Sequence, residues 1–122
     1  MASAERVEIM QASKESLLSV LKDYEAYSEY MDGVSKVEVL ERNGNTAKAK
    51  YDLNVIKTFS YILNLEESDD GINWSFDSGD IFSVNSGSWS LKDLGDGTTE
   101  VTYKVEVEIK IKMIGTGTVS YT

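Results

Sequence analysis

The sequence predicts an α+β domain in which one long antiparallel sheet curves around a short helical segment. Apolar and polar residues alternate with a period of two almost without interruption from residue 34 to residue 113, a pattern typical of half-buried strands. The links between the alternating stretches have hairpin length, so neighbouring strands should be antiparallel. A sheet of this length twists and curls. We therefore expect a space between the sheet and the helices that side chains do not completely fill.

The helical segment follows a first short strand and is expected to begin after Ser13. Ser13 is a good N-cap residue, and Glu15 lies in the first turn, near the positive end of the helix dipole. The leucines that share one face of this helix are Leu17, Leu18 and Leu21. We expect a helix over residues 14–23 and a second helical turn over residues 24–31, which Gly33 ends.

The remaining elements are strands separated by turn sequences. The seven expected strands contain, in order, Val7 and Ile9; Val37 and Val39; residues 47–53; residues 59–65; residues 72–76; Trp89 and Leu91; and residues 101–113. Asn43-Gly44 is a strong hairpin signal because both turn positions need positive φ. Further turns are expected at residues 68–71, 77–80 and 93–98.

The inner face of the sheet is predicted to be the odd-numbered residues of two stretches, residues 47–65 and residues 101–113. A slip of one residue would bury charged side chains without partners, which is costly. The side chains that such a slip would bury are Lys48, Lys50, Glu106 and Lys110.

The composition narrows the classes of function. The chain of 122 residues corresponds to one domain, residues 1–122, and contains no histidine and no cysteine. Proton transfer by histidine, thiolate nucleophiles and the commonest metal ligands are therefore excluded, and we expect no catalytic nucleophile, no metal and no cofactor. The acidic turns at residues 69–71, 77–80 and 93–96 lack the spacing of a calcium-binding loop.

The charge and hydropathy of the chain argue against nucleic-acid and membrane partners. The net charge of −9 opposes contact with nucleic acid. No apolar run reaches the length of a membrane-spanning helix, and residues 1–10 do not resemble a secretion signal. We therefore expect a soluble, cytoplasmic protein with no integral membrane association and no nucleic-acid partner.

The inward phase of the sheet carries an unusually aromatic set of side chains, which predicts a ligand pocket. Flat apolar walls with a few polar groups suit the binding of a small molecule, although each of these residues taken alone can equally be an ordinary core residue. Asn85 can orient a ligand carbonyl or can bond to the backbone. The predicted ligand-binding residues are Tyr51, Leu53, Phe59, Tyr61, Leu63, Trp74, Phe76, Asn85, Trp89, Tyr103 and Val105.

Several segments in order resemble START-like proteins, and the polyketide cyclase/dehydrase and coenzyme Q-binding branch in particular. The segments that carry the resemblance are residues 23–31 with Val34, residues 37–40, residues 87–91, residues 95–98 and residues 101–103. The resemblance implies a helix-grip fold, in which a seven-stranded antiparallel sheet grips a long C-terminal helix and encloses a hydrophobic cavity. Members of that family bind lipids, quinones, sterols, plant hormones or polyketides, and a minority are enzymes.

Two features depart from that family. Ser28 stands where the family usually has a proline. Residues 114–122 are rich in glycine and β-branched residues, which are poor helix formers, so we expect the gripped helix to be absent or replaced. A second copy of the chain, an exchanged segment or a bound amphiphile would then cover the inner face, and we favour a homo-oligomer formed through the last strand.

Three functions follow from these observations. We favour the binding of a lipid-, quinone- or polyketide-like molecule without catalysis. The alternative is a cyclase or dehydrase in which Tyr61, Tyr103 or Asn85 orients the substrate or transfers a proton, although Arg6 and Arg42, the two arginines, are expected at the surface, which weakens this alternative. The third is a protein-interaction module of the ribosome-associated toxin type, which holds no ligand.

Overall fold

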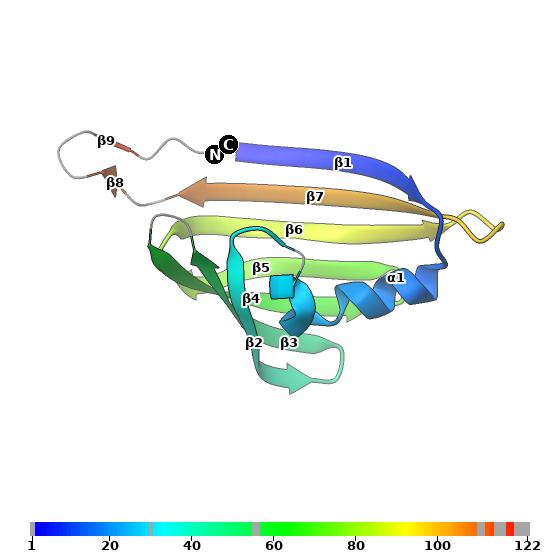
Figure 1. The fold of residues 1–122 in the computed structure, drawn as a ribbon, viewed down its shortest axis with the longest axis horizontal. Coiled ribbons are helices and arrows are strands. Elements are labelled where there is room, and N and C mark those ends of the chain that lie inside the picture. The colour runs from blue at the N-terminus through cyan, green and yellow to red at the C-terminus, as the bar shows by residue number, and fades with distance from the viewer. Residues whose placement is uncertain (1, 30, 55–56, 110–111, 114–116, 119–122) are drawn as a thin grey trace.

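A computed structural model describes residues 2–29, 31–54, 57–109, 112–113 and 117–118. Seven antiparallel strands form one sheet in the order β1-β7-β6-β5-β4-β3-β2 (Figure 1). The strands are β1 (Ala2–Met10), β2 (Val34–Asn43), β3 (Thr46–Asn54), β4 (Thr58–Ser68), β5 (Gly71–Gly79), β6 (Phe82–Asp93) and β7 (Thr99–Ile109). The predicted α+β class and the open, curved sheet are confirmed.

The predicted phase of the sheet is also confirmed for the described residues. Tyr51 pairs with Tyr61 across β3 and β4, and residues that lie directly opposite in an antiparallel pair share a face. In β3 and β4 the odd-numbered residues of 47–51 and 61–67 are buried, whereas the even-numbered residues between them are not. In β7, Val107 is buried whereas Lys104 and Glu106 are exposed. The expectations for Lys110, Ile111 and the side chain of Met113 lie outside the described residues.

Two short helices follow β1 and lie on the inner side of the sheet (Figure 1). They are α1 (Lys14–Leu21) and the 3₁₀ helix η1 (Tyr24–Glu29). The side chain of Ser13 accepts a hydrogen bond from the Ser16 N–H, as expected of an N-cap. The first helix ends at Leu21, two residues earlier than predicted, and the second is a 3₁₀ helix, the tighter form common in short segments.

Polar contacts tie the N-terminal end of α1 to the sheet. The ammonium of Lys14 lies 2.5 Å from the carboxylate of Asp70, in the turn between β4 and β5. The hydroxyl of Thr99, at the start of β7, donates to the carbonyl of Ala12. These contacts fix where the chain passes from β1 onto the inner face.

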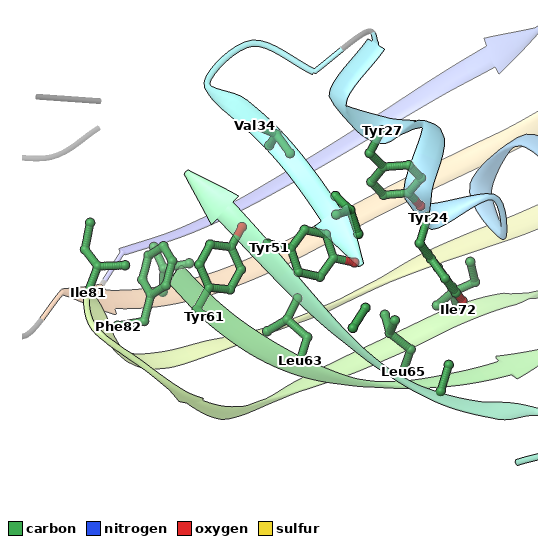
Figure 2. Packing of buried hydrophobic residues seen from close by; sticks show 14 residues of the cluster. Tyr24, Tyr27, Val34, Tyr51, Tyr61, Leu63, Leu65, Ile72, Ile81 and Phe82 are labelled. Atoms are coloured by element: carbon green, nitrogen blue, oxygen red, sulfur yellow. The ribbon is translucent and has the colours of Figure 1, made fainter. Parts of the chain in front are cut away.

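The core lies between η1 and the inner face of β2 to β6 (Figure 2). η1 contributes Tyr24 and Tyr27, which are three residues apart and therefore project to the same side of the helix. Val34 and Phe82 are also buried there although their positions are even-numbered, because β-bulges shift the register beside each of them. The curvature of the sheet brings these side chains together over one part of its inner face.

Three sequence predictions about strands were incomplete or wrong. β1 runs over nine residues, and Val7 and Ile9 face outward with more than half of their surface exposed. Residues 77–79 belong to β5 and not to a turn, because Asp77 forms a bulge opposite Ile62 and the pairing resumes at Ser78. The described part of β7 ends at Ile109, and Lys112–Met113, which was predicted to continue that strand, pairs in a separate two-stranded sheet.

The pairing of β7 and of the segment after it limits how the predicted oligomer could form. Lys112–Met113 (β8) pairs with Gly117–Thr118 (β9) in a separate two-stranded sheet. β7 itself is paired with β1 on one side and β6 on the other, so its described residues offer no free edge to a second chain. The predicted absence of a helix over residues 114–122 lies outside the described residues, apart from the strand at residues 117–118.

Candidate functional site

A cavity of about 250 Å³ lies between η1, the segment after it and the inner face of the sheet. It is lined by residues of η1, of every strand from β2 to β7 and of the link between η1 and β2. The lining residues are Tyr24, Tyr27, Met31, Asp32, Val34, Tyr51, Leu53, Tyr61, Leu63, Leu65, Ile72, Trp74, Phe82, Asn85, Trp89, Tyr103, Val105 and Val107. All of them except Asp32 and Asn85 are apolar or aromatic.

One wall of the cavity is a row of five aromatic rings (Figure 2). The rings of Tyr51 and Tyr61 stack with 5.2 Å between their centroids and only 5° between their planes. Phe82 meets Tyr61 edge to face at 5.0 Å, and Tyr27 continues the row beyond Tyr51 at 6.5 Å and contacts Tyr24. Such contacts stabilise aromatic pairs by more than the burial of apolar area alone. They therefore hold the rings of this wall in place.

A second aromatic group lies across the inner face on β5, β6 and β7. The ring of Tyr103 lies 4.5 Å from Trp89 and 5.9 Å from Trp74, measured between centroids. These three side chains and Val105 are only partly buried, whereas the row on the other wall is buried. The cavity is therefore closed beside η1 and opens over β5 to β7.

Asn85 and Trp74 form a partly buried hydrogen bond at the cavity. The indole Nε1–H of Trp74 donates to Oδ1 of Asn85 over 3.1 Å. Gly87 lies directly opposite Trp74 on β6, and a Cβ atom there would come within 2.5 Å of the indole ring. Gly87 thus leaves the space in which the indole lies and reaches Asn85.

Tyr51 is a cavity residue whose ionisation is disfavoured. Its side chain is buried, and burial raises the pKa of its hydroxyl well above the usual range, with the neighbouring Tyr27 and Tyr61 acting in the same direction. The hydroxyl therefore stays protonated at any physiological pH. It is a hydrogen-bonding group of the cavity and not a base.

A buried carboxylate joins η1 to the sheet at the closed end. Glu67 lies on the inner face of β4, and its Oε2 accepts a 2.5 Å hydrogen bond from the hydroxyl of Tyr24. The guanidinium of Arg42 binds both carboxylate oxygens at 3.1 Å. Burial acts to raise the pKa of Glu67, but the hydrogen bonds from Arg42 and Tyr24 outweigh it and hold that pKa below its usual range.

Both arginines are exposed, as the sequence predicts. The side chain of Arg42 is 44% exposed, and a bulge between Val39 and Glu41 places it opposite Ala47, from where it reaches Glu67. Glu67 itself is buried, with only 8% of its surface exposed. Arg6 pairs loosely with Glu8 on the same strand.

Nine of the eleven predicted binding residues line the cavity. Phe59 and Phe76 do not; Phe59 lies beside Lys57, whose ammonium is 5.2 Å from its ring. The lining residues that were not predicted are Tyr24, Tyr27, Met31, Asp32, Val34, Leu65, Ile72, Phe82 and Val107. Leu65 and Val107 share the inward phase and Tyr24 and Tyr27 share a helix face, so the pattern contained a signal for these four.

Other kinds of site have less support in the described part of the chain. Among the described residues, no three or more carboxylates are grouped so that they could hold a metal ion. In the turn after β6, Asp96 binds the hydroxyl of Thr98, and this hydrogen bond lowers its pKa. None of the described helices is long and apolar enough to cross a membrane. Two further depressions lie on other parts of the sheet and are lined mainly by polar and charged side chains.

Comparisons with known proteins agree with this geometry. A family model described as polyketide cyclase/dehydrase and lipid transport matches residues 10–116. The curated proteins include no significant sequence match to this chain. Among solved structures, a START superfamily protein from Mycobacterium smegmatis is similar with a TM-score of 0.79 and 20% identity, over 93% of this chain and 81% of that chain.

Two other solved structures are similar over most of the chain. The Zhui aromatase/cyclase from Streptomyces sp. R1128 has a TM-score of 0.80 and 16% identity, over 92% of this chain and 70% of that chain. A STAR-related lipid transfer protein from Xanthomonas axonopodis has a TM-score of 0.71 and 16% identity, over 97% of this chain and 72% of that chain. At such identities the similarity shows a common fold.

Proposed function

Since this chain belongs to the polyketide cyclase/dehydrase and lipid transport family, we propose that it binds a hydrophobic small molecule in the cavity between η1 and the inner face of the sheet. The START-like resemblance of the sequence is confirmed at the level of family and fold. The observation that carries the proposal is the cavity itself, whose lining is apolar or aromatic at all but two positions.

The size and shape of the cavity indicate how a ligand would enter. Pockets for drug-sized ligands usually span about 300–1,000 Å³, and this cavity measures about 250 Å³. A small ring system fits within it, whereas a larger molecule would extend through the open side above Trp89 and Tyr103. Both residues then serve as the entrance wall and Tyr51 and Tyr61 as the inner wall.

Binding without catalysis is the function that the ionisable groups favour. Efficient proton transfer needs a group whose pKa lies near the working pH. The pKa values of Tyr24 and Tyr51 are both raised, chiefly by burial, and the sequence contains no histidine or cysteine. The side chains of Tyr51 and Asn85 are therefore better suited to hold a ligand than to exchange protons with it.

A cyclase or dehydrase remains the second candidate because the similar structures include an aromatase/cyclase. In such an enzyme Tyr61, Tyr103 and Asn85, which all line the cavity, would hold a reactive chain in a bent conformation. Turnover of a bound poly-β-ketone by the purified protein, above the rate in a Val105→Phe variant, would favour this candidate.

The proposal is tested by what the protein carries when it is purified. We expect mass spectrometry of an organic extract to find a hydrophobic compound in amounts comparable with the protein. Val105 lies opposite Gly87 on the inner face, so Val105→Phe should project a ring into the cavity and abolish the co-purification. Thr102→Phe, on the outer phase of the same strand, is the matched control. Extracts of wild type and Val105→Phe that are equally empty would favour a protein-interaction module.

Self-association through the last strand stays a proposal for the residues after Ile109. The partly exposed inner face over β5 to β7 supports it, because a second copy would shield that face from water. The paired edges of β7 mean that contact has to come from beyond Ile109. Light scattering on dilute protein tests it, and a mass of one chain at every concentration would contradict it.

A further inference from the structure

The side chain of Asn85 has a fixed orientation. The indole N–H of Trp74 can only donate a hydrogen bond, so the amide of Asn85 must present its oxygen to Trp74, as the 3.1 Å contact shows. The amide nitrogen, Nδ2, then points away from Trp74. Rotation of the amide by 180° would place two donors face to face and leave the indole N–H without an acceptor.

Two buried polar groups of the cavity have no hydrogen-bond partner among the described residues. They are Nδ2 of Asn85 and the hydroxyl of Tyr51, whose residues are only 7% and 6% exposed. None of the fully occluded polar side-chain atoms in the described part of the chain lacks a partner, so both of these atoms retain contact with open space. Because both residues line the cavity, that space is the cavity.

The cavity lining, as far as the described residues form it, offers no positive charge to a ligand. Neither lysine nor arginine occurs among the lining residues, which do include Asp32. Arg42, at the closed end, already binds both oxygens of Glu67. The whole chain has a net charge of −9. An anionic ligand would lose its hydration without gaining a cation, which is strongly unfavourable in an apolar site.

The walls favour a flat ligand. The rings of Tyr51 and Tyr61 lie parallel to each other, and the rings of Trp74, Trp89 and Tyr103, on β5, β6 and β7, also line the cavity. Aromatic surfaces bind planar ring systems by stacking and edge contacts. A flexible aliphatic chain would gain less from such walls and would lose more conformational freedom.

We propose that the ligand is an uncharged, planar ring compound with a carbonyl oxygen, and that Asn85 selects it by donating a hydrogen bond from Nδ2 to that oxygen. This inference rests on the proposed binding function. It assigns Asn85 as the specificity-determining residue, Trp74 as the residue that positions it, and the Tyr51 hydroxyl as a second donor. Fatty acids and other anionic lipids are excluded as preferred ligands.

Three tricyclic probes distinguish the selection of a carbonyl oxygen by Asn85 from hydrophobic binding as such. Fluorene has the ring system alone, 9-fluorenone adds one carbonyl oxygen, and fluorene-9-carboxylate adds a negative charge. Equilibrium dialysis at pH 7.5 measures the dissociation constant of each. A site built to hydrogen-bond a ligand oxygen discriminates against the analogue that lacks it, so we expect 9-fluorenone to bind about tenfold more tightly than fluorene, and fluorene-9-carboxylate to bind most weakly.

Variants assign the effect to Asn85. Asn85→Leu should bring the dissociation constant of 9-fluorenone to that of fluorene and leave fluorene binding intact, which also shows that the variant is folded. Asn73→Leu, on the exposed outer phase of β5, is the matched control and should keep the wild-type ratio. Equal binding of fluorene and 9-fluorenone by the wild type, or tightest binding of the carboxylate, would overturn the inference but not hydrophobic binding. Failure of all three probes to bind would overturn both.

Discussion

Glu67, on β4, links η1 and β2 at the closed end of the cavity. Its carboxylate receives hydrogen bonds from Arg42 on β2 and from Tyr24 on η1. A buried carboxylate is costly unless its oxygens are satisfied, and here they are. The same contacts set the position of Tyr24, which begins the aromatic row that forms one wall of the cavity.

Replacing this carboxylate should weaken the fold in a manner that depends on pH. Because hydrogen bonds to charged groups contribute more than neutral ones, Glu67→Gln should lower the free energy of unfolding by about 2 kcal/mol at pH 7. The folded-state pKa of Glu67 lies below its ordinary value of 4.5. The ionised form therefore stabilises the fold above that value, and the stabilisation is lost as the pH falls through the lowered pKa.

Urea unfolding of both proteins at several pH values measures this contribution. The difference between wild type and Glu67→Gln should be largest near neutral pH and should shrink below about pH 4. Glu66→Gln, next to it on the exposed face of β4, is the control and should change stability little. A difference that is constant from pH 7 to pH 3 would mean that the ionised carboxylate has no special role.

Gly87 is a second residue whose size matters, because it lies against the indole ring of Trp74. A Cβ atom there would lie 2.2 Å from the carbonyl oxygen of Lys104 and 2.5 Å from the ring of Trp74, so Gly87→Ala should displace the indole from Asn85. We expect a loss of about 1–3 kcal/mol of stability and a change in the near-ultraviolet circular dichroism of tryptophan. Ser86→Ala, on the opposite face of β6, should show neither. An unchanged tryptophan spectrum in Gly87→Ala would show that the indole accommodates a methyl group.

At the scale of elements, η1 is the part of the structure that closes the cavity. It packs mainly against β2, reaches β4 through the hydrogen bond from Tyr24 to Glu67, and buries Tyr24 and Tyr27. The hydroxyl of Tyr27 donates to the carbonyl of Leu21, at the end of α1. The backbone amide of Val39, on β2, donates to the side chain of Glu25. A six-residue element held by so few contacts is drawn from the less stable part of a fold.

Loosening η1 should be measurable without unfolding the sheet. Tyr24→Phe keeps the ring but removes the hydrogen bond to Glu67, so the amides of η1 should exchange with solvent faster, by about tenfold if the bond contributes a little over 1 kcal/mol. Amides of β3 and β4 should exchange at the wild-type rate. Hydrogen exchange followed by NMR tests this. Equal acceleration in η1 and in the sheet would show that η1 does not open on its own.

The elements also show what the sequence could predict. Alternation is a local signal, so the inward phase of Tyr51, Tyr61 and Tyr103 was predictable. Bulges depend on pairing across strands, and for that reason the inward position of Phe82 and the contact of Arg42 with Glu67 were missed. Phe59 and Phe76 have the inward phase but do not line the cavity, because its extent depends on where η1 covers the sheet.

At the scale of the whole molecule, a curved sheet is covered by helices over part of its inner face. The sheet has seven strands, and the described helices lie near only part of its inner face (Figure 1). The buried aromatic row begins on η1 with Tyr24 and Tyr27 and runs along the sheet to Phe82. The group of Trp74, Trp89 and Tyr103 is only partly buried. A ligand bound between them would bury aromatic surface that otherwise contacts water, at about 25 cal/mol per Å².

A hydrophobic molecule that binds between these two aromatic groups should quench the tryptophan fluorescence of the protein. The two tryptophans of the chain, Trp74 and Trp89, both line the cavity. Titration with 2-methyl-1,4-naphthoquinone, a planar quencher, should give saturable quenching with one site per chain. Val105→Phe should weaken it, and Thr102→Phe should leave it unchanged. Quenching that rises linearly without saturation, and equally in all three proteins, would contradict the proposed binding.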